Sequence, residues 1–304
     1  RKLPTVEAVG HVRARHEEAG ALVDTSVLVT RFLDRSLPYW TLFQSGQLAR
    51  YREHLLDAMA ILLVQLHLAG VFWGDCSLNN ALFRRDAGAL QAYLVDAETS
   101  EAHPSLSDGQ REHDLEITEE NVCGALLDLI AQRLLDENFP VYETGAYLRR
   151  RYETLWHEIQ HEEELDRDES YRIQERIRGL NELGFSVDEV ALATAEGGAR
   201  LRLKVLVADR NFHRTQLATL TGIDAEENQA RLMLNEMHEL KGRLSAERNR
   251  SVPLSAAAFL WYEQTFSPIS EALQAAFGDA DALEPGANAA AVSGEGRADT
   301  LERY

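Results

Sequence analysis

The sequence contains few cysteines and no long apolar run. Its 304 residues include only two cysteines, Cys76 and Cys123. That is far below the cysteine density of a secreted, disulfide-stapled domain, so we expect two reduced thiols. No apolar stretch approaches the roughly 18 residues that a membrane-spanning helix needs, and no signal-peptide pattern opens the sequence. These absences predict a cytoplasmic protein without a membrane span.

Basic side chains are also scarce relative to acidic ones. Lys and Arg number 31 against 50 Asp and Glu, which gives a formal net charge of −19. Nucleic acids and anionic membranes attract proteins rich in Lys and Arg, so we expect neither as a partner. A nucleotide that arrives with Mg²⁺ stays compatible with this charge, because the cation offsets the charge of an acidic site.

The composition is that of an ordinary globular protein, with 45% hydrophobic and 27% charged residues and a length sufficient for two domains.

Apolar and polar residues alternate over 6–14 and 26–33, which predicts two strands, and Pro38 breaks the pattern. The clearest helix covers 48–66, where apolar residues recur every three or four positions. Gly70 follows it as a plausible stop.

The rest of the chain predicts further helices and hairpins. Asp86, Ala87 and Gly88 supply a hairpin turn. Thr118 is the expected N-cap of the next helix, and Asp224 with Glu227 has the form of a capping box. The remaining expected elements are helices over 146–165, 168–183 and 253–276, a hairpin across Gly197 and Gly198, and a disordered tail over 278–304.

The stretch "VFWGDCSLNNALF", residues 71–83, carries the main functional signal. It places Asp75 five residues before Asn80, and the hairpin that follows ends on Asp96. Phosphoryl transfer needs a carboxylate near the attacking hydroxyl and oxygen ligands that hold Mg²⁺ against the phosphates. The alternative is a surface turn, because Asp and Asn commonly cap turns. The helix before the loop and the hairpin after it favour a catalytic loop.

Two stretches resemble the catalytic and metal-binding segments of the protein-kinase-like superfamily, namely "LHLAGVFWGDCSLNNALF" and the later "AYLVDAET". It is most similar to the branch of lipopolysaccharide core kinases and small-molecule phosphotransferases. With "RIRGLNELGF" and "LTGIDAEENQARLMLNEM" downstream, the chain resembles bacterial lipopolysaccharide-kinase-like proteins that carry an attached domain of unknown function 4032. The resemblance covers most of residues 2–275.

This resemblance implies roles for particular residues. Asp75 would accept the proton of the substrate hydroxyl, while Asn80 and Asp96 would hold Mg²⁺. Trp73 stands where kinases usually have His, and Asp96 is followed by Ala-Glu rather than Phe-Gly, which puts kinase-style switching of that segment in doubt. The implied hinge beside the adenine of ATP consists of Arg31, Phe32, Leu33 and Asp34.

A complete kinase fold also has a Gly-rich loop over the phosphates and a strand Lys. Residues 1–40 contain no such loop and no suitable Lys after Lys2, so we expect the chain as printed to bind Mg²⁺-ATP poorly. The predicted fold class is α+β, a kinase-like C-lobe with most of the N-lobe missing, followed by a mainly helical accessory domain. The expected divisions are an N-lobe remnant and hinge over 1–34, the C-lobe over 35–140, the accessory domain over 141–277 and the tail over 278–304.

The predicted function is an ATP- and Mg²⁺-dependent phosphotransferase. Its acceptor would be an unknown hydroxyl of a sugar, a glycan or a small molecule. The alternative is a pseudokinase-type scaffold that binds nucleotide weakly or not at all. In that case the acidic accessory domain would recruit a protein partner.

Two other motifs are set aside. "HEIQH", residues 157–161, matches the HExxH pattern of zinc proteases, but its helix has no apolar wall and no third ligand follows. The stretch "QLATLTGIDAEENQARLML" has the pattern of a DNA-binding helix-turn-helix. Its second helix, however, opens with acidic residues that the phosphates of DNA would repel. We interpret it as a packing helix.

Overall fold

The computed structural model describes residues 3–18, 21–44, 51–166, 168–169, 171–195 and 200–277. Helices and strands are mixed through this part of the chain, as the α+β prediction requires. Leu48, the turn at Gly197 and Gly198, and the tail over 278–304 lie outside the described residues. The predicted divisions near 34, 140 and 277 stay predictions. The chain separates into two compact units, the first comprising Arg1–Arg85, Ala89–Glu164 and Glu189–Asp209, the second Asp86–Gly88, Leu165–Asp188 and Arg210–Tyr304.

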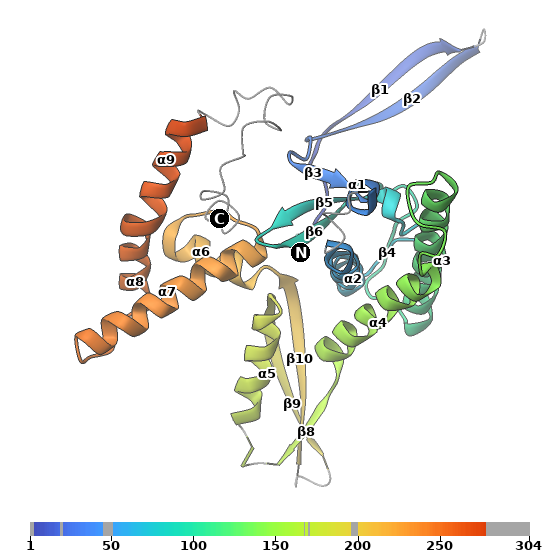
Figure 1. The fold of residues 1–304 in the computed structure, drawn as a ribbon. Coiled ribbons are helices and arrows are strands. Elements are labelled where there is room, and N and C mark those ends of the chain that lie inside the picture. Colours follow the sequence, from blue (N-terminus) through green and yellow to red (C-terminus); the bar gives the residue numbers. More distant parts are fainter. Residues whose placement is uncertain are drawn as a thin grey trace. The chain divides into compact units, whose positions relative to one another are not determined.

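The first unit opens with a long antiparallel hairpin, drawn in blue in Figure 1. Its strands are β1 (Ala8–Glu18) and β2 (Ala21–Thr30). They reach further toward the turn than the predicted strands over 6–14 and 26–33, whereas at the other end β1 begins at Ala8 and β2 ends at Thr30, inside the predicted bounds. The added residues are mostly polar and include a cross-strand ion pair, with Arg15 Nε 2.6 Å from Asp24 Oδ1. Apolar alternation therefore underestimates the hairpin.

The next elements of the first unit are β3 (Ser36–Pro38), α1 (Tyr39–Gln44) and α2 (Tyr51–Leu68). Pro38 thus ends a short strand and does not lie in a loop. Helix α2 is the predicted apolar helix. Gly70 follows with φ +78° and donates its N–H to His67 O at 3.0 Å, so it stops the helix as expected. The apolar face is completely buried at Leu55, Met59, Leu62, Leu63 and Leu66.

Short strands surround the loop that follows α2. They are β4 (Val71–Phe72), β5 (Ala81–Asp86), β6 (Ala89–Leu94) and β7 (Glu101–Ala102), with the one-turn 3₁₀ helix η2 (Leu78–Asn80) before β5. The predicted hairpin is confirmed, because Ala87 and Gly88 both have positive φ and join β5 to β6. The sheet order is β3-β5-β6, and β4 pairs separately with β7.

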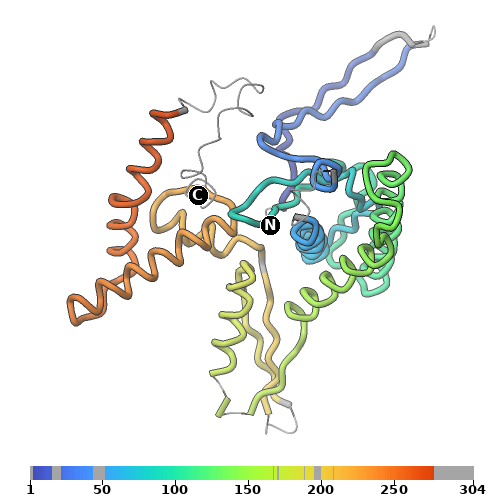
Figure 2. The backbone as a smooth tube through the Cα atoms, in the orientation of Figure 1, coloured from blue at the N-terminus to red at the C-terminus, as the bar shows by residue number. Residues whose placement is uncertain are grey.

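Helices α3 (Asp108–Ala131) and α4 (Val141–Gln160) complete the helical part of the first unit. Helix α4 packs against both α2 and α3 (Figures 1 and 2). The prediction that Thr118 begins α3 is wrong. Ser107 is the N-cap, in a capping box with Gln110, and Thr118 lies within the helix, where its hydroxyl donates to Asp114 O at 2.7 Å. This i−4 bond lets a Thr sit inside a helix.

The predicted helix over 146–165 is too long at its C-terminal end. Helix α4 ends at Gln160, His161 takes an extended ψ of 139°, and strand β8 (Glu163–Asp166) follows. This strand joins β9 (Phe185–Ala195) and β10 (Arg200–Arg210) in the order β8-β10-β9. Across these strands the carboxylate of Glu164 lies 3.5 Å from the guanidinium of Arg202. Helix α5 (Tyr171–Glu182) lies between β8 and β9 in sequence.

The described C-terminal part of the second unit is helical. It contains α6 (Phe212–Thr221), α7 (Glu227–Glu247), α8 (Leu254–Trp261), the π-helical turn η4 (Tyr262–Phe266) and α9 (Ser267–Phe277). The helix-turn-helix stretch is α6 and α7 with Gly222 between them, and both helices pack into one core, as interpreted. That core consists of Leu217, Ala230, Met233, Leu234, Met237, Ala258 and Trp261.

The predicted capping box at the start of α7 is wrong. Glu226 is the N-cap and makes no side-chain cap, while Asp224 accepts a hydrogen bond from Arg214 instead. Asp86 caps the helix: its carboxylate accepts the N–H groups of Asn228 and Gln229 at 2.9 and 2.8 Å. Asp86 is 142 residues away from Asn228 in sequence, which no local pattern could reveal.

No helix in the described part of the chain is long and apolar enough to cross a bilayer.

Candidate functional site

Strand pairing brings the loop after α2 beside the segment that follows β6. Val71 pairs with Ala102 and Phe72 with Glu101. Beyond this ladder, the hydroxyl of Thr99 donates to Trp73 O at 2.9 Å. Residues 73–80 and 95–100, which come from the two ends of the β5–β6 hairpin, therefore lie next to each other.

Asp75 and Asn80 interact directly. The Asn80 amide nitrogen donates to Asp75 Oδ2 at 2.9 Å and to the backbone oxygen of Asp75 at 3.0 Å. Because the nitrogen of this amide is engaged with Asp75, the oxygen is the atom that can bind a cation. The five-residue spacing closes through η2, which is one short turn. Asp75 is half-buried at this position.

Asp96 lies next to the same loop. Its backbone oxygen accepts the indole N–H of Trp73 at 3.2 Å, and the preceding residue, Val95, donates its N–H to Asn80 O at 3.1 Å. The Asp96 side chain is exposed and one of its oxygens accepts the N–H of Glu98 at 3.0 Å. The structure thus places Asp75 beside Asn80 and the backbone of Asp96 beside Trp73, while the neighbouring Val95 bonds to Asn80. Their catalytic and metal-binding roles stay predictions.

Asn121 of α3 is a site residue that sequence reasoning missed. Its amide nitrogen donates to Asp75 Oδ1 at 2.9 Å and also reaches Cys76 O at 3.3 Å. Asp75 therefore receives one amide N–H on each carboxylate oxygen, from Asn80 and from Asn121. A carboxylate held from two sides keeps one orientation. No spacing rule links Asn121 to a loop 46 residues earlier in the chain.

Asp114, also on α3, anchors the loop backbone. Its side chain is completely buried and accepts the N–H of Trp73 at 2.7 Å and of Gly74 at 2.9 Å. Gly74 has φ +77°, which suits Gly and disfavours other residues. The prediction missed Asp114 because it started the helix at Thr118. The helix begins after Ser107, which puts Asp114 on a buried helical face.

His67, at the end of α2, completes the anchor. Its Nε2 lies 3.0 Å from Asp114 Oδ2, and its side chain is completely buried. Burial lowers the pKa of His67, and the hydrogen bond to Asp114 opposes this without outweighing it. His67 is therefore neutral at pH 7 and acts as a fixed hydrogen-bonding group.

Cys76 follows Asp75 but is closed off from solvent. Its side chain is completely buried, and the structure leaves both Cys76 and Cys123 as free thiols. Burial raises the pKa of Cys76, so the thiol stays protonated and is a poor nucleophile. It fills space behind the loop.

The implied hinge segment is exposed coil after β2. Phe32 is 80% exposed, and Leu33 is half-buried with its backbone oxygen accepting the hydroxyl of Ser36 at 2.8 Å. Arg31 pairs with Glu7 at 2.7 Å, and Asp34 is exposed. Adenine binding by these residues stays a prediction.

The donor set at the loop fits a magnesium ion. Mg²⁺ binds through oxygen and usually takes only one or two carboxylates from the protein, with phosphates and water completing its shell. The Asn80 amide oxygen and the Asp96 carboxylate are oxygen groups of this chemical kind, and their binding of a metal stays a prediction. Within the described ranges no group of three or more His, Cys, Asp or Glu residues is placed to hold a metal on its own.

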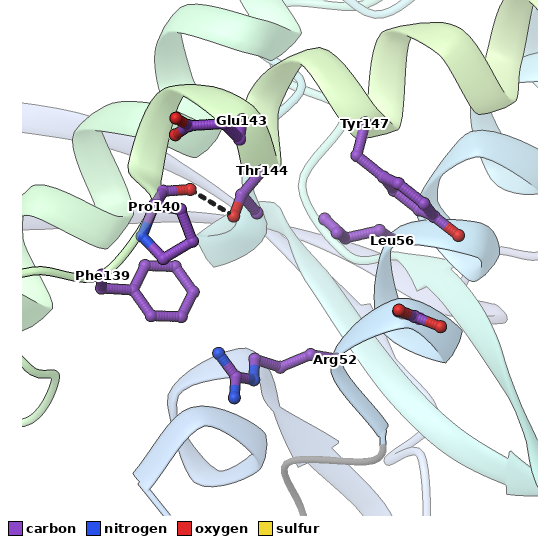
Figure 3. A pocket seen from close by; sticks show the side chains of 8 residues that line it. Arg52, Leu56, Phe139, Pro140, Glu143, Thr144 and Tyr147 are labelled. Atoms are coloured by element: carbon purple, nitrogen blue, oxygen red, sulfur yellow. Dashed lines mark hydrogen bonds between the residues drawn. The ribbon is translucent and has the colours of Figure 1, made fainter.

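A separate pocket of about 490 Å³ lies at the other end of α2. Figure 3 shows Arg52 directed toward Phe139, whose ring centroid is 5.0 Å from the guanidinium carbon. Arg52 and His67 are separated by about 22 Å along the helix, at 1.5 Å per residue. The pocket is therefore distinct from the loop. Its other lining residues are Glu53, Leu56, Pro140, Glu143, Thr144 and Tyr147.

The two histidines of the HExxH match lie near the end of α4. Their rings stack with centroids 4.9 Å apart, and His161 Nδ1 lies 2.9 Å from His157 O. His157 is exposed. The bond to the backbone occupies one ring nitrogen of His161.

Two family models match this chain. Residues 2–123 match the lipopolysaccharide kinase (Kdo/WaaP) family, and residues 154–287 match the domain of unknown function DUF4032. The resemblance predicted from the sequence is confirmed by both matches. A search of curated proteins finds no significant match.

One solved structure that is similar to this chain is described as "WaaP in complex with acyl carrier protein". The two chains are 19% identical, and the TM-score is 0.31. The match covers 51% of this chain and 70% of the other. Because this similarity is low, it carries no argument, and the similarity to kinases is shown by the family match over residues 2–123.

Proposed function

We propose that this protein is an ATP- and Mg²⁺-dependent phosphotransferase whose catalytic loop is residues 73–80. The observation that carries the proposal is the contact between Asp75 and Asn80, in which the amide nitrogen bonds to the carboxylate and leaves the amide oxygen as the atom that would bind a cation. The family match over residues 2–123 supports it.

Asp75 is the proposed acceptor of the proton from the attacking hydroxyl. Asn80 and Asn121 each occupy one lone pair of its carboxylate, and each oxygen keeps another lone pair for a substrate proton. Proton acceptance by a positioned carboxylate contributes typically 10²–10⁴-fold to a rate. The loop backbone is fixed by Asp114, so the carboxylate does not have to be ordered when substrate binds.

Asn80 and Asp96 are the proposed metal ligands. Bound Mg²⁺ would neutralise the charge of the nucleotide phosphates and orient the transferred phosphoryl group. Asp96 is exposed, so its carboxylate is open to a cation brought in by a nucleotide. Residues 31–34 are proposed to lie beside the adenine.

The proposed acceptor is a hydroxyl of a sugar or a glycan. Its support is the name of the family that residues 2–123 match, which describes kinases of lipopolysaccharide. The net charge of −19 counts against a nucleic acid as the acceptor, because an acidic protein repels its phosphates.

Two substitutions in the intact natural protein test the proposal. Asp96→Asn removes an ionised metal ligand, so Mg²⁺-dependent nucleotide binding should fall by roughly tenfold or more in calorimetry. Asp75→Asn should leave that binding within about twofold and lower ADP production by two orders of magnitude or more. Asp57→Asn is a control. Asp57 is on α2, ten residues before His67, and pairs with Arg151 of α4 rather than with the loop.

The proposal fails if both site variants bind nucleotide and produce ADP like the parent. Absence of nucleotide binding by the intact parent would favour the alternative of a pseudokinase-type scaffold.

A further inference from the structure

A chain of buried hydrogen bonds extends from the catalytic loop to helix α4. Asp114 accepts the N–H groups of Trp73 and Gly74, as described above, and it also lies 3.0 Å from His67 Nε2. On the other side of the ring, His67 Nδ1 lies 2.6 Å from the hydroxyl of Tyr152. Tyr152 is 1% exposed and belongs to α4.

The direction of each hydrogen bond follows from chemistry. The Asp114 carboxylate accepts from two backbone N–H groups and can only accept from His67 as well, so Nε2 carries the ring proton. A neutral imidazole has one N–H, so Nδ1 is an acceptor and the Tyr152 hydroxyl must donate to it. Donation therefore runs from Tyr152 to His67 and from His67 to Asp114.

We propose that Tyr152 is a positioning residue for the catalytic loop, acting through His67 and Asp114 on the backbone that carries Asp75. The loop cannot shift without disturbing Asp114, which holds two successive N–H groups. Asp114 cannot rotate freely because His67 binds one of its oxygens. The His67 ring, in turn, is fixed at its second nitrogen by Tyr152, and the two rings pack edge to face with centroids 5.3 Å apart.

Tyr152 lies outside both matched segments, which cover residues 2–123 and 154–287, whereas His67 and Asp114 lie in the first. The segment that carries Tyr152 is helix α4, and the DUF4032 match begins two residues later on the same helix. Trp156, one turn further along α4, stacks on Tyr152 with ring centroids 5.7 Å apart. This packing holds the phenol ring in place.

The chain offers a matched control. Tyr147 is on the same helix, and its hydroxyl also reaches α2, donating to Asp57 at 3.4 Å. Tyr147→Phe and Tyr152→Phe remove the same atom from the same helix pair, but Asp57 has no link to the loop among the hydrogen bonds and ion pairs between described residues. Tyr152→Phe leaves His67 Nδ1 as a buried acceptor without a donor, which weakens the whole chain of bonds.

Amide hydrogen exchange tests the inference without any need for turnover. In Tyr152→Phe the amides of Trp73 and Gly74 should exchange about tenfold faster, while Tyr147→Phe should change them less than twofold. His67→Gln, which keeps a donor for Asp114 but loses contact with Tyr152, should loosen the same two amides. The double variant His67→Gln with Tyr152→Phe should add nothing further, because both act on one path.

A second readout rests on the proposed function. In the intact natural protein, Tyr152→Phe should lower kcat about tenfold with nucleotide affinity unchanged, because nucleotide and metal are held by other residues. Unchanged exchange at Trp73 and Gly74 in Tyr152→Phe, or equal loosening in Tyr147→Phe, would overturn the inference. The two readouts are separable. If Tyr152→Phe speeds exchange at Trp73 and Gly74 but the parent protein shows no phosphoryl transfer, the inference is supported and the proposed function is not.

Discussion

Replacing Asp114 by Asn should release the proposed catalytic loop, residues 73–80, from its anchor. The carboxylate of Asp114 places one oxygen on Gly74 N–H and the other on Trp73 N–H and His67. An Asn side chain has nearly the same shape but only one acceptor oxygen. Its NH₂ group would therefore face at least one backbone N–H, and two donors cannot bond to each other.

The expected cost follows from this mismatch. A buried N–H left without an acceptor costs about 1–3 kcal/mol, and the remaining bonds lose the strength that an ionised acceptor gives them. We expect the free energy of unfolding of the first unit to fall by about 2–4 kcal/mol. For a unit of this size, that corresponds to a decrease in Tm of roughly 5–15 °C.

Urea denaturation monitored by amide exchange at Trp73 and Gly74 measures this effect in the unit that contains Asp114. Glu116→Gln is the control on the same helix, because Glu116 is 59% exposed and its pairing with His113 at 3.5 Å is solvated. It should change stability by less than about 0.5 kcal/mol. The reasoning is refuted if Asp114→Asn unfolds with the parent and leaves both loop amides protected.

Three further substitutions have expected outcomes. Asp86→Ala removes the cap of helix α7 and should cost the second unit about 1–2 kcal/mol, measured by exchange of the first-turn amides of α7; an unchanged rate would contradict the cap. Burial alone would raise the pKa of Glu227, but hydrogen bonds from His213 and Arg214 outweigh it and lower that pKa. The stability that Glu227 supplies is therefore present above its ordinary pKa of 4.5 and lost as pH falls. Glu227→Gln should thus be less stable than the parent at pH 7, with a difference that shrinks in denaturation curves below about pH 4.5; a constant difference would contradict the assignment. Gly74→Ala should destabilise the loop by about 1–3 kcal/mol in thermal unfolding, because φ is +77° and a Cβ would meet Thr99 O at 3.0 Å; a neutral result would show that the loop relaxes.

Local patterns in the sequence predicted the elements that build the site. The apolar face of α2, its stop at Gly70 and the turn at Ala87 and Gly88 all follow from short-range rules, and all are confirmed. These elements fix where the loop begins and how the chain returns to Asp96. The contact of Asp75 with Asn80 is equally local, since it closes over five residues.

The supporting residues could not be predicted in the same way. Asn121, Asp114 and Tyr152 contact the loop or its anchor across 46, 40 and 85 residues of sequence, and such contacts depend on how the helices pack. The local misassignments have related causes. Thr118 and Asp224 have the side chains of helix caps, but in the folded chain their oxygens bind elsewhere.

The length of the β1–β2 hairpin shows the same limit. Apolar alternation found the inner strand segments, whereas the outer part is mostly polar and includes Arg15 and Asp24, which face each other across the strands. A pairing between two strands cannot be read from either strand alone.

The central proposal is that Asn80 and Asp96 hold a divalent cation beside Asp75. Titration of the intact natural protein with Mn²⁺ and nucleotide, followed by paramagnetic loss of amide NMR signals, tests it most directly. The signals of Asp75, Asn80 and Asp96 should disappear first, and Asp96→Asn should require a much higher Mn²⁺ concentration for the same loss. Signal loss centred elsewhere in the chain, or an identical titration for Asp96→Asn, would contradict the claim.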